Sequence, residues 1–148
     1  MAAFKNNPSE WQRLDFRLLQ NSWVNLYWKM EMLEKDLEWF GSAKYTCTDF
    51  NCRNWRNETQ MHQEIKEGLF FPDYYGGNWV ALNDCLSDLE IEETGQIIVF
   101  RKLDSLPLQQ AHTLLDIFAT NARRHLLFGK RLILLAQVSD PNYQMEPV

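Results

Sequence analysis

The 148-residue sequence has few cysteines, no long apolar run and no apolar segment at its start. The three cysteines, Cys47, Cys52 and Cys85, are few and odd in number, which favours reduced thiols in a cytosol over a disulfide scaffold. The apolar runs fall short of the ~18 residues of a membrane span, and the opening MAAFKNNPSEW does not have the apolar core of a signal peptide. We therefore expect a cytoplasmic protein with no membrane partner.

Motifs for catalysis and metal binding are also missing. The sequence holds no P-loop, no HExxH and no G-x-S-x-G. Cys47 and Cys52 have no second Cys or His pair at ligand spacing, which argues against zinc. His62, His112 and His125 fall on expected helices without a nucleophile partner, so we interpret them as ordinary helix-surface or helix-end residues. We expect no catalytic residue, no metal and no cofactor.

What the sequence does hold is apolar surface and an uneven charge. Hydrophobic residues make up 45% of the chain and aromatics 14%, enough for one compact core. The net charge of −5 argues against nucleic acid as the direct partner. Residues 67–100 carry seven acidic side chains and no Lys or Arg, so this segment has net charge −7 and the rest of the chain +2. Two interpretations stay open: a solvated face, or a docking surface for a basic protein.

Runs rich in β-branched and aromatic residues alternate with segments whose apolar residues recur at helical spacing. This alternation predicts an α/β fold with a small, mainly parallel sheet. The first strand–helix–strand unit, residues 23–50, predicts a right-handed crossover and a parallel pair. Strands are expected at residues 23–28, 45–50, 96–101 and 131–138. Helices are expected at residues 8–20, 29–40, 57–68, 78–89 and, as one helix or two, between Pro107 and Gly129.

The helix expected at residues 78–89 and the loop before it carry the strongest binding signal. Asp84 and Asp88 lie one turn apart on its outward face, and Tyr74 and Tyr75 stand just upstream. A tyrosine supplies apolar area with one polar tip, and a carboxylate can pair with an arginine or lysine of a partner. The same residues fit a second interpretation, in which the tyrosines lie in the core and the aspartates are merely solvated.

Residues 71–86, FPDYYGGNWVALNDCL, resemble the barstar family of intracellular inhibitors of microbial ribonucleases. The PxYYGxNxxALxxCL pattern is specific, and the resemblance extends over about residues 44–138 in the same order of strands and helices. It implies a three-layer α/β domain around a parallel sheet. Residues 1–43 look like an added N-terminal βα extension packed on the same domain, and residues 139–148 look like a C-terminal tail.

In that family the loop and the following helix plug the nuclease active site as an acidic mimic of the phosphate backbone. The resemblance therefore implies an inhibitor or immunity protein, with a cognate ribonuclease or another basic protein toxin as its partner. By position it gives partner-binding roles to Tyr74 and Asp84, while Val80, Asn83 and Thr120 replace an acidic residue, a tryptophan and a glutamate of the family. The candidate partner-binding residues are Asp73, Tyr74, Tyr75, Gly76, Gly77, Asn78, Val80, Asn83, Asp84, Ser87, Asp88 and Thr120.

The three replaced positions leave open a partner other than barnase and a duty other than inhibition. The alternative is a protein-interaction module on a barstar fold, with a non-nuclease partner bound through residues 1–43. Trp11, Trp23 or Trp28 would then supply the exposed aromatic contact. A small enzyme is disfavoured by the missing catalytic constellation, and we expect a monomer.

Overall fold

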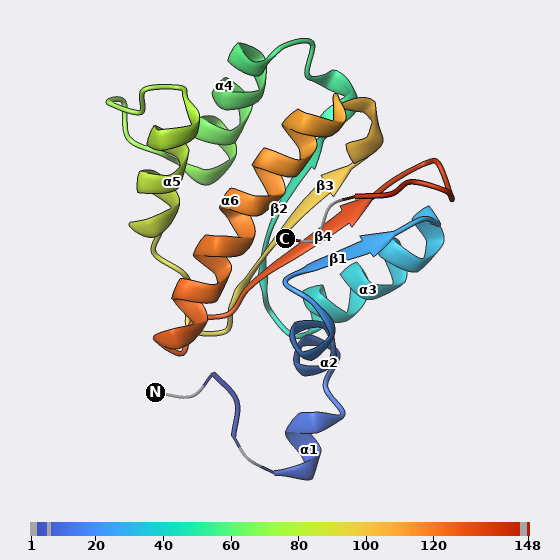
Figure 1. Ribbon diagram of the computed structural model, residues 1–148. Coiled ribbons are helices and arrows are strands. Elements are labelled where there is room, and N and C mark those ends of the chain that lie inside the picture. The colour runs from blue at the N-terminus through green and yellow to red at the C-terminus, as the bar shows by residue number, and fades with distance from the viewer. Residues whose placement is uncertain (1–2, 6, 146–147) are drawn as a thin grey trace.

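The computed structural model describes residues 3–5, 7–145 and 148. Within these residues, the strands form one parallel sheet in the order β1-β4-β3-β2 (Figure 1). The strands are β1 (Val24–Tyr27), β2 (Thr46–Asn51), β3 (Gln96–Arg101) and β4 (Leu132–Gln137). The helices are α1 (Pro8–Trp11), α2 (Leu14–Asn21), α3 (Met30–Ser42), α4 (Glu58–Leu69), α5 (Trp79–Ser87) and α6 (Leu108–Leu127). The predicted α/β class is confirmed, and the sheet is parallel throughout.

The pairing expected between the first two strands is wrong. β1 and β2 lie at opposite edges of the sheet, because β4 and β3 occupy its centre. Burial explains this order: β4 is buried along its whole length and β3 along nearly all of it, whereas β1 and β2 both expose residues. A strand covered on both faces is apolar throughout, and these two sequences, QIIVFR and LILLAQ, suit the centre.

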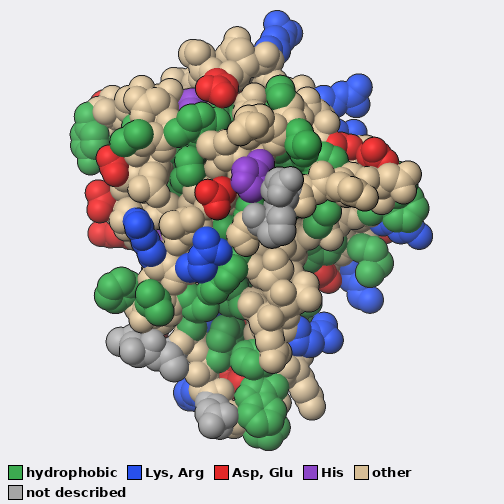
Figure 2. Space-filling view, in the orientation of Figure 1, with side chains coloured by type: hydrophobic (Ala, Val, Ile, Leu, Met, Phe, Trp, Pro, Cys, Tyr) green, Lys and Arg blue, Asp and Glu red, His purple; other side chains and the backbone are tan. Residues whose placement is uncertain are grey.

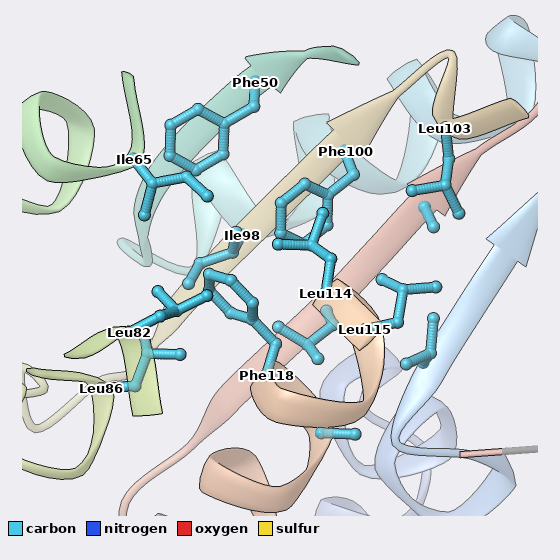
Figure 3. Packing of buried hydrophobic residues seen from close by; sticks show 14 of the residues in the cluster. Phe50, Ile65, Leu82, Leu86, Ile98, Phe100, Leu103, Leu114, Leu115 and Phe118 are labelled. Carbon is cyan, nitrogen blue, oxygen red and sulfur yellow. The ribbon is translucent and has the colours of Figure 1, made fainter. Parts of the chain in front are cut away.

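Helices cover both faces of the sheet and give three layers (Figure 1). On one face Ile98 and Phe100 of β3 pack with α4, α5 and α6, and Figure 3 shows Phe118 of α6 directed at them. On the other face Ile97 and Val99 pack with α2 and α3. The alternation along β3 thus feeds two separate apolar cores. Within the described residues, no helix is long and apolar enough to span a membrane.

The single helix expected at residues 8–20 is divided into α1 and α2, because Arg13 is extended with φ −67° and ψ 144°. This break lets Asp15, which is fully buried, meet two cations and a hydroxyl. Arg13 Nη2 lies 3.0 Å from the carboxylate and Arg131 Nη1 3.4 Å, and Tyr45 donates its hydroxyl proton at 2.5 Å. A buried carboxylate needs such partners, so Asp15 fixes the N-terminal residues to the starts of β2 and β4.

The region between Pro107 and Gly129 forms the single helix α6. The inward side of α6 is buried, and Figure 3 shows two of its residues, Leu114 and Phe118, facing the sheet. α5 lies beside α6 on this face. This packing leaves only one side of α5 available to solvent.

Gly68 allows α4 to approach β2 closely. A Cβ at this position would lie 2.7 Å from Cε1 of Phe50, closer than real Cβ contacts. We predict that Gly68→Ala lowers the free energy of unfolding by about 1–3 kcal/mol, because the core is overpacked. Urea unfolding followed by circular dichroism measures the change.

Gly41 is the matched control, because it too is the penultimate residue of its helix, but a Cβ added there would meet nothing within 4 Å. Gly41→Ala should raise the free energy of unfolding by about 0.4–1 kcal/mol. Equal effects of the two substitutions would contradict the close approach of α4 to β2.

Candidate partner-binding site

The α4–α5 loop and α5 are shaped by local backbone chemistry. After α4 the chain turns at Phe70, and Phe71 donates its backbone N–H to Lys66 O at 3.0 Å. Gly77 has φ +66°, a conformation that favours glycine. Asn78 then caps α5 by accepting a hydrogen bond from the Ala81 N–H at 2.8 Å. These contacts fix where α5 begins.

Tyr75 ties this loop to α4. Its hydroxyl shares a 2.5 Å hydrogen bond with Nδ1 of His62, and Trp79 packs edge-on against the same imidazole with ring centroids 5.2 Å apart. His62 is 3% exposed, so its interpretation as a helix-surface residue is wrong. Burial raises the pKa of Tyr75 and lowers the pKa of His62. Tyr75 therefore holds the loop down, while neighbouring Tyr74 is 79% exposed.

The outward side of α5 is acidic. Asp84, Ser87 and Asp88 are exposed, whereas Leu82 and Leu86 are fully buried. In the part of the chain that the structure describes, neither aspartate has a salt-bridge partner. In Figure 2, acidic side chains gather at the left edge, where Figure 1 shows α5.

The charges of Asp84 and Asp88 act on the neighbouring Cys85 thiol. Its pKa is raised by burial and by the charges of Asp88 and Asp84. Val80, 73% exposed, adds an apolar contact area one turn before Asp84. The exposed side of α5 therefore combines negative charge with apolar surface.

Other expected site residues are arranged differently. Asn83 is half-buried and accepts a hydrogen bond from Asn121 Nδ2 at 3.0 Å, so its amide is turned toward α6. Thr120 accepts a 3.3 Å hydrogen bond from Arg123, whose guanidinium also lies 5.7 Å from the Trp23 ring centroid. The Arg123 guanidinium therefore lies beside Thr120 and the Trp23 ring.

The remaining expected site residues lie in the α4–α5 loop. Gly76 and Gly77 are exposed, and the exposed Asp73 lies 3.9 Å from Nζ of Lys66. A surface pair at that distance contributes little to stability. Within the described residues, no group of three or more His, Cys, Asp or Glu is arranged to hold a metal ion.

Sequence reasoning missed His62 as a member of this site. The signal was present, because His62 lies three residues before Ile65 and therefore shares part of the inward face of α4. The neighbouring apolar residues Met61, Ile65 and Leu69 are buried on the same helix. What the helix pattern did not contain was the partner, Tyr75, which comes from the following loop.

Comparison with known proteins now identifies the fold family. Residues 45–136 match the family described as Barstar (barnase inhibitor). The chain belongs to the barstar family. The family match covers β2, β3, all but the last residue of β4, and the whole α4–α5 region. The resemblance carried by the YYG segment is confirmed.

Individual relatives add less. The Bacillus subtilis (strain 168) protein "Putative ribonuclease inhibitor YrdF" is 49% identical over 35 residues, which cover 24% of this chain and 38% of that protein. The solved "Structure of Drosophila ORC bound to AT-rich DNA and Cdc6" has a TM-score of 0.48 and 18% identity, over 80% of this chain and 40% of that chain. A likeness as low as the second informs neither fold nor function.

The Tyr75–His62 contact generates a stability prediction. Tyr75→Phe removes the hydroxyl and leaves Nδ1 of a buried imidazole unpaired, so the free energy of unfolding should fall by about 1–3 kcal/mol. Tyr74→Phe is the control, because Tyr74 is 79% exposed, and it should change stability by less than about 0.5 kcal/mol. Chemical denaturation of the two variants measures the difference, and equal losses would contradict a tethering role.

His62 also predicts a pH dependence. Its pKa is lower in the folded chain than in the unfolded chain, chiefly because of burial, so the unfolded state binds the proton more tightly. The stability contribution is complete above the ordinary pKa of about 6.5 and is lost as pH falls below it, by up to about 1.4 kcal/mol per pH unit. Denaturation between pH 7.5 and 5.5 should show a shallower loss for His62→Gln than for the wild type. Equal slopes would remove His62 as the titrating group.

Proposed function

We propose that this protein inhibits a basic ribonuclease by inserting the outward face of α5 into the enzyme's active-site cleft. The observation that carries the proposal is the pair Asp84 and Asp88, exposed on a helix whose other side is buried and without a salt bridge among the described residues. Membership of the barstar family supports it. So does the ribonuclease-inhibitor name of the Bacillus subtilis relative, which this chain matches over 38% of that protein.

Electrostatics explains why such a helix would block a nuclease. A ribonuclease binds a polyanion, so its cleft must be positively charged, and carboxylates on a helix can occupy the phosphate positions. Opposite charges also speed the encounter and make it sensitive to salt. The hydrogen bond between Tyr75 and His62 holds the loop before binding, which reduces the ordering entropy lost in the complex. No catalytic residue is required.

The replaced family positions bear on the choice of enzyme. Val80 offers an apolar side chain where the family has an acidic one, and Asn83 is already bonded to Asn121. Thr120 is next to the Arg123 charge. We infer that the cognate enzyme presents an apolar contact opposite Val80 and differs from barnase in its cleft. The inhibitor would act as a cytoplasmic monomer in a one-to-one complex.

A second candidate function rests on apolar exposure near the N-terminus. Leu26, Trp28 and Met32 are 44%, 51% and 53% exposed, on or next to β1 and the start of α3. These residues would support a protein-interaction module with a non-nuclease partner. Truncation of residues 1–43 is a poor test, because it removes β1 and the buried Asp15. Trp28→Ala is the cleaner variant.

The inhibition itself is tested in an RNA-cleavage assay. The protein is titrated into barnase and into any ribonuclease encoded beside its gene. Stoichiometric loss of cleavage is expected with the neighbouring enzyme, and weaker loss with barnase. Binding that leaves cleavage intact, or no binding to either enzyme, would contradict the proposed function.

Asp84 is the residue whose removal should matter most. Asp84→Ala is expected to weaken the complex by at least ~2 kcal/mol if the carboxylate becomes a buried charged anchor. Calorimetric titration against the inhibited ribonuclease measures this change. Glu38→Ala is the control, since it removes one exposed negative charge from α3, on the opposite side of the sheet. A comparable loss from both variants would mean that net charge, and not the position of Asp84, governs binding.

A further inference from the structure

Phe70 occupies an unfavourable position for a large apolar residue. It follows the last residue of α4 with φ 57° and ψ 41°, and its side chain is 90% exposed. Glycine or asparagine is usual at such a left-handed helix end, because a Cβ is disfavoured there. Leu69 and Phe71 on either side are buried, so the core gains nothing from Phe70. Strained residues of this kind concentrate at functional sites.

The Phe70 ring lines an open pocket of about 450 Å³ between the ends of α4 and α5. Tyr74 contributes a second exposed ring, and Asp88 and Glu90 contribute two exposed carboxylates. Among the described residues, neither carboxylate has a salt-bridge partner, and the pocket lining includes no Lys or Arg. Two aromatic rings and two free carboxylates therefore share one concave surface.

We propose that this Phe70 pocket receives an arginine side chain of the partner. A guanidinium is planar and weakly hydrated, so it can stack on an aromatic ring while its N–H groups donate to carboxylates. The lysine ammonium is a strongly hydrated point charge, so it stacks less favourably on an aromatic ring. The inference rests on the proposed function for the basic character of the partner, and it extends the contact surface beyond α5. Asp88 belongs to both the acidic face of α5 and the Phe70 pocket.

The first test of the pocket needs no ribonuclease. End-blocked hexa-arginine and hexa-lysine peptides are titrated into the wild-type protein at low salt, with affinity measured by calorimetry and the Tyr74 ring followed by NMR. The arginine peptide should bind at least about five-fold more tightly, which is the scale of a guanidinium–aromatic contact. Its binding should shift the Tyr74 ring signals. Equal affinity for the two peptides would overturn the proposal.

Two matched substitutions separate the pocket from general charge. Phe70→Ala should abolish the preference for the arginine peptide. Phe128→Ala is the control, because Phe128 follows α6 and its side chain is 73% exposed, and this variant should retain the preference. Glu90→Gln should weaken the arginine peptide more than Glu93→Gln, because Glu93 is exposed but does not line the pocket. A preference that survives Phe70→Ala, or equal effects of the two glutamate variants, would contradict the assignment.

Phe70→Gly separates loss of binding from loss of stability. Glycine relieves the left-handed backbone, so this variant should be at least as stable as the wild type while it loses the arginine preference. If the ribonuclease is inhibited equally by wild type and Phe70→Gly, the pocket proposal fails and the α5 proposal survives. If the peptides bind as expected but no ribonuclease is inhibited, the proposed function fails and the pocket stands.

Discussion

The burial of one side of α5 is the constraint on which the rest of the site depends. Leu82 and Leu86 are fully buried, and in Figure 3 they lie with Phe118 of α6 and Ile98 of β3. Because the helix cannot rotate without exposing these leucines, Asp84 and Asp88 are held outward. The cost of displaying two like charges is small at an exposed surface. Apolar packing on one side of the helix therefore fixes the charge pattern on the other.

Several contacts outside α5 maintain this arrangement. The hydrogen bond from Tyr75 to His62 connects the loop to α4, and α4 in turn lies close to β2 at Gly68. On the far side of the sheet, the buried Asp15 joins residues before β1 to the starts of β2 and β4. The site thus rests on a sheet that is held from both faces, which suits a surface that binds without first reorganising.

Local sequence patterns predicted the bounds of the strands and helices well, but they predicted poorly which elements lie side by side in the fold. The strand at 45–50 and the helix at 78–89 appear within two residues of the expected bounds, because periodicity and caps are local. The place of β1 beside β4 depends on which strands are buried on both faces. The bond of Asn83 to Asn121 joins residues 38 positions apart, and the left-handed backbone of Phe70 has no mark in the sequence. These features emerge only from tertiary packing.

The central claim is that the partner contacts the α4–α5 loop and the outward face of α5. Hydrogen–deuterium exchange of the protein, alone and with the ribonuclease it inhibits, tests this most directly. The account predicts new protection across residues 74–88 and unchanged exchange in α3 (Met30–Ser42). Protection confined to β1 and α3, with residues 74–88 exchanging as in the free protein, would contradict it and assign binding to the N-terminal residues.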